Sequence, residues 1–332
     1  MGAVVLGAGR DASRPRIGLV LGAGGLTGAA WMTGALPALQ QRLGRAAGDA
    51  EVMIGTSAGS VLVAGLRCRA SVEEMIGFHR GQAIPGLREL PPAQGGRRLP
   101  PLPQPRMGSP MLWCTALLTP HRVHPRVSAT AWLPQGRGQH TALHAMIGHL
   151  HARHHAARGT AGHWVDGQTW IVALDYDSGQ RVVFGRPGAP AAPLPDAVVA
   201  SCSIPGWYRP VRIGGRRYID GGVRSLTSLV LMADAGVDEV YVLAPMASTA
   251  PGPARKPHER IERTVRGLAT QSLLRDARRL RARGITVTVL TPGAEDLAVM
   301  GVNPMDPRHG QAVLETSLRT SPAALARPLL AA

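Results

Sequence analysis

The chain has 332 residues, a length that suits one large α/β domain or two small ones. Its composition, 45% hydrophobic with 41 Gly and 28 Pro, excludes an intrinsically disordered chain and indicates a globular protein rich in loops. The net charge of +16 comes almost wholly from arginine and favours anionic surfaces, but there is no zinc-finger spacing, RNP-type motif or basic run interleaved with aromatics, so we expect no nucleic-acid partner.

Residues 17–39 open the ordered part of the chain and have the length of a membrane span, but six glycines and Pro37 interrupt them. We therefore expect a flexible segment over 1–15, then a buried strand at 17–21, a turn and a helix at 29–43. The three cysteines are irregularly spaced, which fits neither a disulfide framework nor a zinc site. They indicate a reducing compartment, so we expect a cytoplasmic protein, with peripheral membrane association as an option.

A second strand at 52–54 and a helix at 61–66 repeat the first strand–helix unit. Two such units in tandem predict a parallel sheet. Between residues 80 and 165 the character changes, because ten arginines face a single acid, Glu89, and the first half is crowded with proline. We interpret 80–165 as an insertion or cap over the α/β core.

Nine of the 12 histidines fall between His121 and His163. Four of them share one helical face, which makes zinc conceivable, but no carboxylate or cysteine lies among them and we expect no metal or other cofactor: His140, His144, His151 and His155. An apolar stripe lies beside them: Leu143, Met146, Ile147 and Leu150. The helix that carries both is predicted either to pack on the core or to touch a membrane.

Regular alternation resumes with a hairpin over 169–175 and 180–184 and a strand pair around Val211 and Tyr218. A strand at 237–245, a helix at 259–283 and a last strand at 285–290 follow. We predict a three-layer α/β/α fold with a mostly parallel central sheet in one domain over 16–310, followed by a C-terminal tail over 311–332.

The sequence Gly55-Thr56-Ser57-Ala58-Gly59 lies between an apolar strand and an apolar helix, the context of a nucleophile elbow. Glycines are needed there because a serine on so tight a turn adopts strained backbone angles and its neighbours must be small. The alternative is a tight turn with no chemistry.

Upstream, the run from Gly22 to Gly28 follows a strand and opens a helix, so its N–H groups can form a nest for an oxyanion. A dinucleotide-binding loop is the rival interpretation, but the third glycine of that fingerprint would fall on Thr27. A third element, Asp220-Gly221-Gly222, ends a short β run. Alone it is a turn signal, but an aspartate there could face the serine.

Together these three elements resemble the patatin-like phospholipase family, and the run from Ala200 to Pro210 resembles a segment that this family places before Asp-Gly-Gly. The resemblance covers residues 16–66 and 169–292. It implies a Ser57–Asp220 dyad, a backbone oxyanion hole and a lipid or acyl-ester substrate; the hole would be formed by Ala23, Gly24 and Gly25. The family usually has Arg or Lys where this chain has Thr27, so a cation at that place is not implied.

The resulting expectation is a serine acylhydrolase of the phospholipase A or lysophospholipase type. A solvated aspartate is a weak base, so an apolar pocket must raise the pKa of Asp220. A triad that adds His258 or His309 is an alternative. Two other functions share the same residues: a catalytically silent lipid module that binds anionic membranes, and an acyltransferase with an acceptor other than water.

Overall fold

The computed structural model describes residues 14–84, 86, 101–248 and 257–326. Most of the predicted flexible N-terminal segment and the proline-rich stretch over 87–100 therefore lie outside the described residues. Eight strands form the central sheet: β1 (Ile17–Leu21), β2 (Val52–Thr56), β5 (Gln168–Asp175), β6 (Arg181–Phe184), β7 (Val211–Ile213), β8 (Arg216–Asp220), β9 (Glu239–Leu243) and β10 (Thr286–Leu290).

The sheet is parallel through the run β10, β9, β1, β2 and β5 and antiparallel where β6 and β8 pair with β5 and β7 pairs with β8. The mostly parallel sheet, the hairpin and the strand pair predicted from the sequence are all confirmed. The parallel strands β1, β2 and β9 consist mainly of apolar residues and are almost wholly buried on both faces, as a parallel sheet requires.

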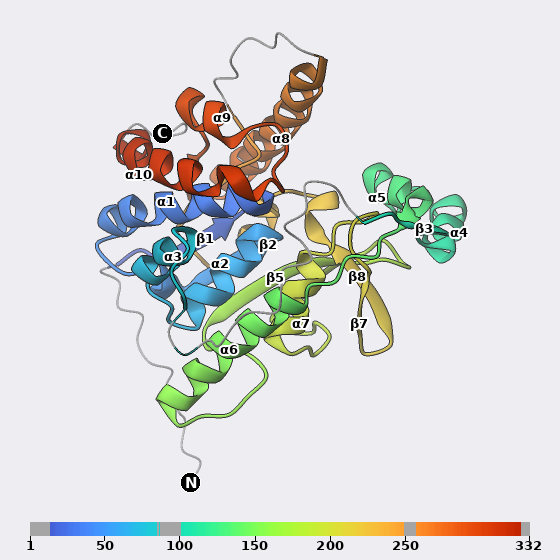
Figure 1. Cartoon of the computed structure of the whole chain (residues 1–332), viewed down its shortest axis with the longest axis horizontal. Helices are drawn as coiled ribbons and strands as arrows, with labels where there is room; N and C mark the ends of the chain where they lie inside the picture. Colours follow the sequence, from blue (N-terminus) through green and yellow to red (C-terminus); the bar gives the residue numbers. More distant parts are fainter. Residues whose placement is uncertain (1–13, 85, 87–100, 249–256, 327–332) are drawn as a thin grey trace.

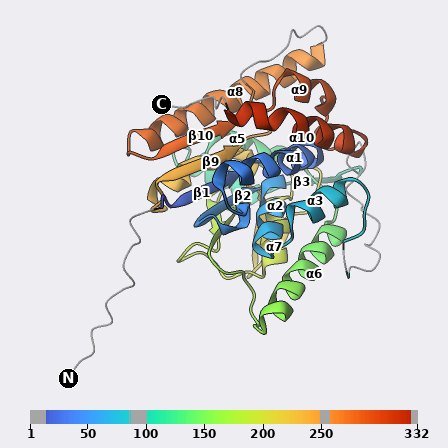
Figure 2. The same cartoon turned by 90° about the vertical axis from the view of Figure 1, so that its left-hand side faces the viewer.

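Helices cover both faces of the sheet (Figures 1 and 2). Side chains that alternate along each strand enter two separate apolar layers, with Leu19 and Met53 in one and Val20 and Ile54 in the other. The first layer lies under α1 (Gly25–Leu43), α2 (Ala58–Arg67) and α7 (Leu194–Ser201). The second lies under α8 (Pro257–Arg281) and the 3-10 segment Leu229–Asp234. The predicted three-layer α/β/α architecture is confirmed.

Shorter helices complete the described chain: α3 (Val72–His79), α4 (Pro110–Leu118), α5 (Pro125–Ala129) and α9 (Ala294–Met300). The two remaining strands, β3 (Gln104–Met107) and β4 (Pro134–Gln135), pair with each other outside the central sheet. Within the described residues, no helix combines the length and apolar character needed to cross a bilayer.

The segment expected to be a C-terminal tail is instead a helix of the domain as far as Ala326. Helix α10 (Gly310–Ala326) packs on α1, with Val313 and Leu314 buried and the Ser317 hydroxyl donating to the carbonyl of Trp31 at 2.7 Å. The sequence pattern of α10 is weakly amphipathic and contains Pro322, so the contact with α1 decides its structure.

Helix α6 (Thr141–Arg158) carries the histidine-rich stretch and packs on the core, which decides between the two interpretations of its apolar stripe. Ile147 and Leu150 are buried against the first apolar layer. His140 stacks on Tyr208 with ring centroids 3.7 Å apart, so this imidazole is part of the packing. In the described part of the chain, no group of three or more His, Cys, Asp or Glu side chains is arranged to hold a metal ion.

Candidate active site

Ser57 lies on the turn between β2 and α2, as the sequence predicted for a nucleophile elbow. Its backbone has φ of 53° and ψ of −123°, a conformation that a residue other than glycine rarely adopts. Such a backbone costs on the order of 1–3 kcal/mol and persists only where the surrounding structure enforces it. Ser57 as a whole residue is 6% exposed, so the turn holds it in a largely dry site.

The glycines on either side of Ser57 are required by the close approach of backbone. A Cβ atom on Gly59 would lie 1.9 Å from the carbonyl oxygen of Leu21, because α2 starts directly against the end of β1. A Cβ atom on Gly55 would lie 2.5 Å from the Cα of Ser60. The pattern of small residues is therefore explained by the elbow itself.

Asp220 is brought to Ser57 by an unusual junction along β5. Strand β2 pairs with one edge of β5 as far as Thr56 opposite Val172, and β8 takes over the same edge at the next residue, with Asp220 opposite Ala173. The other edge is occupied by β6 through this region. Because β2 runs parallel to β5 and β8 antiparallel, their carboxyl ends meet head-on. The two strands thus meet end to end rather than side by side.

The Ser57 side chain lies near enough to the Asp220 carboxyl at this junction to lower its pKa as a hydrogen-bond donor. Burial raises the pKa of Asp220 to about 6, against the opposing effects of the hydrogen bonds from the Ser57 side chain and the Gly222 amide. The Gly222 N–H donates to Oδ1 of Asp220 at 2.7 Å, which fixes the carboxylate. A pKa near neutrality is what a general base needs to be ionised and still basic.

Two serines that the sequence reasoning did not assign connect the elbow to the aspartate. The Ser201 hydroxyl accepts the N–H of Ser57 at 2.9 Å and donates to the carbonyl of Val172 at 2.7 Å. The carbonyl of Ser203 accepts the N–H of Asp220 at 3.0 Å. Both belong to the run from Ala200 to Pro210 that carries part of the family resemblance, so the signal was present but its role was not visible without the fold.

The glycine-rich loop lies against both halves of the site. A Cβ atom on Gly59 would come within 2.9 Å of the Gly22 carbonyl, and one on Gly222 would come within 3.2 Å of the Ala23 Cβ. Gly25 has φ of +62°, a left-handed conformation that favours glycine.

The three amides predicted for the oxyanion hole are not equivalent. The N–H of Ala23 donates to the carbonyl of Leu226 at 2.7 Å and is therefore occupied. Within the described chain, the N–H groups of Gly24 and Gly25 have no protein acceptor, and they start α1, whose N-terminus favours negative charge. The candidate hole thus narrows to these two amides. Thr27 is buried and donates its N–H to the carbonyl of Pro304.

Of the two histidines considered for a triad, His309 does not join the site. His309 lies in a 3-10 turn and faces Asp306 at 3.8 Å. His258 belongs to α8, but its side chain lies outside the described residues. The groups that act on the pKa of Asp220 include no imidazole.

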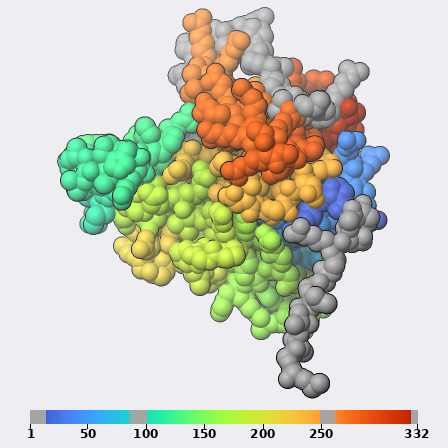
Figure 3. Space-filling view, turned by 180° about the vertical axis from the view of Figure 1, so that it is seen from behind, coloured from blue at the N-terminus to red at the C-terminus, as the bar shows by residue number. Residues whose placement is uncertain are grey.

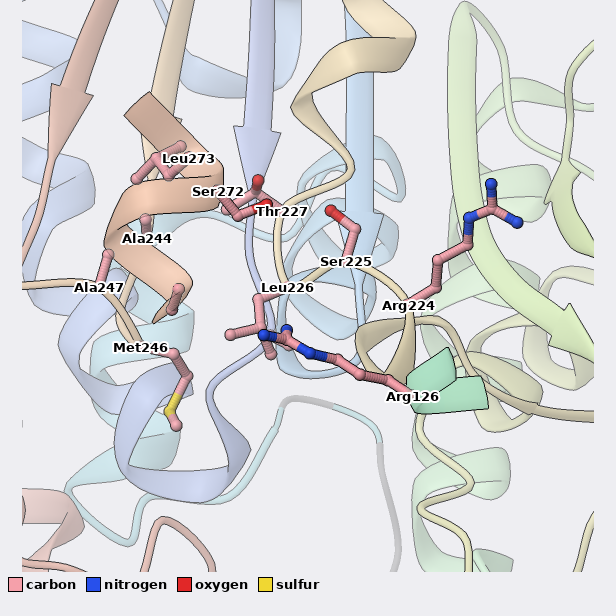
Figure 4. A pocket seen from close by; sticks show the side chains of 12 residues that line it. Arg126, Arg224, Ser225, Leu226, Thr227, Ala244, Met246, Ala247, Ser272 and Leu273 are labelled. Atoms are coloured by element: carbon pink, nitrogen blue, oxygen red, sulfur yellow. The ribbon is translucent and has the colours of Figure 1, made fainter. Parts of the chain in front are cut away.

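A pocket opens beside the glycine-rich loop (Figure 4). Its lining runs from Ala23 through the segment 224–227 to α8 and includes Arg126 of α5. Figure 4 shows the Arg126 side chain extending toward Leu226, next to the loop. The pocket therefore combines an apolar wall with two arginines, Arg126 and Arg224, beside the glycine-rich loop.

A family model and solved structures resemble this chain. The family model described as "Patatin-like phospholipase" matches residues 19–229, more than half of the chain and a range that contains Ser57 and Asp220. Two solved structures are similar to this chain. VipD from Legionella pneumophila has 11% sequence identity and a TM-score of 0.37, and the match covers 92% of this chain and 67% of VipD. The type III effector protein ExoU has 15% identity and a TM-score of 0.42, and the match covers 94% of this chain. The chain spans about half the length of ExoU, 53%. It belongs to the patatin-like phospholipase family, and with that to the lipid acyl hydrolases that act on carboxylic ester bonds.

Proposed function

We propose that Ser57 and Asp220 form a catalytic dyad that hydrolyses an acyl ester of a membrane phospholipid or lysophospholipid. The observation that carries the proposal is the meeting of a strained serine elbow with a buried carboxylate at adjacent positions along β5, where burial raises the pKa of Asp220 to about 6. A nucleophile needs an adjacent base that takes its proton, and Asp220 is an ionisable group on which the Ser57 side chain acts directly.

The reaction then proceeds in two halves. The Ser57 oxygen attacks the ester carbon as its proton passes to Asp220, and the amides of Gly24 and Gly25 receive the oxyanion. Collapse breaks the bond to the alcohol, which takes the proton from Asp220, and leaves the acyl group on Ser57. Asp220 next removes a proton from a water molecule as the water oxygen attacks the acyl carbon. Collapse of this second tetrahedral intermediate releases the fatty acid, and the proton passes from Asp220 back to the Ser57 oxygen.

A dyad without histidine is chemically adequate here because basicity and oxyanion stabilisation come from different parts of the site. Burial supplies the basicity of Asp220. Oxyanion donors that are already in place contribute about 3–4 kcal/mol each when judged by the loss of one donor. Because the Gly24 and Gly25 amides are held at the end of a long helix, little reorganisation is needed as charge develops.

Arg126 supports a substrate with a negatively charged head group. Its side chain is exposed, lines the pocket beside the loop and forms no ion pair within the described residues. A guanidinium matches the geometry of a phosphate and binds it through paired N–H groups. Replacement by glutamine, Arg126→Gln, is expected to reduce the preference for phospholipid over a neutral acylglycerol of the same chain length.

The test compares matched variants on a soluble p-nitrophenyl ester. Ser57→Ala and Asp220→Asn are each expected to reduce kcat by about 10³-fold or more, since members of a catalytic unit fail together. The control is Ser178→Ala, which removes a serine hydroxyl whose role is to accept the N–H of Gln180 in the β5–β6 turn, and which should keep full turnover. Full turnover in either dyad variant would refute the proposal.

A further inference from the structure

A lobe made of residues 101–135 stands out from the α/β body. It contains β3, α4, α5 and β4, and it projects beyond β8 in Figure 1 and at the left edge of Figure 3. Besides Leu102 at its start, six large apolar side chains of this lobe are exposed: Met111, Trp113, Leu117, Leu118, Trp132 and Leu133. Leu118 is 79% exposed and Trp132 is 65% exposed, fractions that a folded protein does not usually give to such residues at one place.

These side chains form one surface rather than scattered contacts with solvent. Four of them lie on α4, and the Trp113 and Trp132 rings meet edge to face with centroids 5.7 Å apart, which joins α4 to the turn after α5. We name the six residues the apolar tip. The rings of tryptophan are the side chains that most favour the boundary between the head groups and the acyl chains of a bilayer.

The inner side of the lobe is firmly attached, so the exposure of the tip is not a sign of loose packing. Leu112 and Val127 are buried in a small apolar cluster with Tyr176, whose hydroxyl donates to the carbonyl of Thr130 at 2.8 Å. The Ser109 hydroxyl donates to Asp177 at 2.8 Å. The fold thus holds α4 with one face on the body and the other facing outward.

The charged side chains that the lobe itself carries have one sign. The sequence contains no aspartate or glutamate between Glu89 and Asp166. Four exposed arginines surround or adjoin the lobe, and none forms an ion pair within the described parts of the chain: Arg106, Arg122, Arg126 and Arg137. Arginines without acidic partners beside exposed apolar side chains match a surface that is both negatively charged and apolar underneath.

We infer that the apolar tip inserts into the head-group region of a bilayer that contains anionic lipid, with the surrounding arginines on its phosphates. The inference builds on the proposed function in one respect: docking through this lobe would bring lipid to the side of the molecule where Arg126 reaches the pocket. It replaces α6 as the membrane-facing element, because the apolar stripe of α6 packs on the core.

Binding to vesicles tests the inference without depending on catalysis. The full chain carrying Ser57→Ala is sedimented with vesicles of phosphatidylcholine, with and without phosphatidylserine. Adding Leu118→Ala and Trp132→Ala is expected to lower the partition coefficient by about tenfold or more, because less apolar surface leaves water. The matched control adds Val265→Ala and Leu268→Ala, two exposed apolar residues of α8, and should bind as the parent does.

The charge is tested separately with Arg106→Gln and Arg122→Gln. These changes should weaken binding to the phosphatidylserine vesicles and reduce its salt dependence, while binding to phosphatidylcholine alone should change little. Thermal unfolding of each variant checks that the lobe is still folded.

The inference is overturned if the parent chain does not bind vesicles, as expected of a tip that docks on a protein instead, or if the α4 and α8 variants bind equally well. If instead the proposed dyad is wrong, the results differ: vesicle binding stays intact, and ester turnover no longer depends on Ser57 and Asp220.

Discussion

Replacing the buried aspartate by asparagine should stabilise the protein at neutral pH while removing its activity. Burial raises the pKa of Asp220 from 3.8 to about 6, so the ionised carboxylate costs folding free energy. Each pKa unit corresponds to about 1.4 kcal/mol, which makes this cost on the order of 3 kcal/mol above pH 7. Asparagine has no charge to bury and keeps an oxygen that can accept the Gly222 N–H.

The sign follows from linkage. Since the pKa of Asp220 is higher in the folded than in the unfolded chain, its contribution is most favourable below about pH 4 and is lost as the pH rises through about 6. The gain of Asp220→Asn over the parent should therefore be near zero at pH 4 and reach roughly 2–3 kcal/mol at pH 8, measured by urea unfolding at a series of pH values.

For a matched control, Asp177→Asn, the expected change in stability has the opposite sign. Asp177 is held by Arg217 and Ser109, and the Arg217 hydrogen bond lowers the pKa of this carboxyl. Asp177→Asn should therefore destabilise the chain at neutral pH. A loss of stability in Asp220→Asn at pH 8, or a gain that does not depend on pH, would show that burial does not set the properties of this carboxylate and would refute the reasoning.

Three further predictions concern the same site. The value of kcat/KM should rise with pH along a single ionisation near 6, because Asp220 must lose its proton to act as a base, and a flat profile between pH 5 and 7 would contradict this assignment. Ser201→Ala should lower stability by about 1–3 kcal/mol and also lower kcat, since it leaves the Ser57 amide without its acceptor. The control Ser317→Ala removes an equally buried hydroxyl between α10 and α1 and should lower stability without lowering kcat. Gly25→Ala should lower kcat and destabilise the chain by more than the roughly 1 kcal/mol expected for the control Gly44→Ala. Both glycines have φ near +60°, but only a Cβ on Gly25 would meet backbone, at 2.6 Å from the Pro304 carbonyl oxygen. Equal losses of stability in the two variants would rule out a special role for the loop.

The sequence was sufficient for the parts of the fold that depend on local pattern. Short apolar runs bounded by glycine identified β1 and β2, and the spacing of Gly55, Ser57 and Gly59 identified the elbow, because these signals follow from backbone sterics within a few residues. Their physical basis is local, so no knowledge of the remaining chain was needed.

Features that depend on contacts between distant segments were not predictable. The head-on meeting of β2 and β8 along β5 follows from pairing over more than 100 residues, and the role of Ser201 follows from that meeting. The occupied amide of Ala23 depends on Leu226, and helix α10 depends on α1. The apolar tip escaped notice because an apolar run such as 110–118 looks like a core helix unless its exposure is known.

In the proposed dyad, Ser57 is a nucleophile activated by Asp220 alone. Treating the chain with a fluorophosphonate and mapping the modified peptide by mass spectrometry tests it most directly, since the reagent reacts covalently with activated serines. We predict modification of the peptide that contains Ser57, at a rate that falls sharply in Asp220→Asn. Modification of a different serine, or an unchanged rate in Asp220→Asn, would contradict the claim.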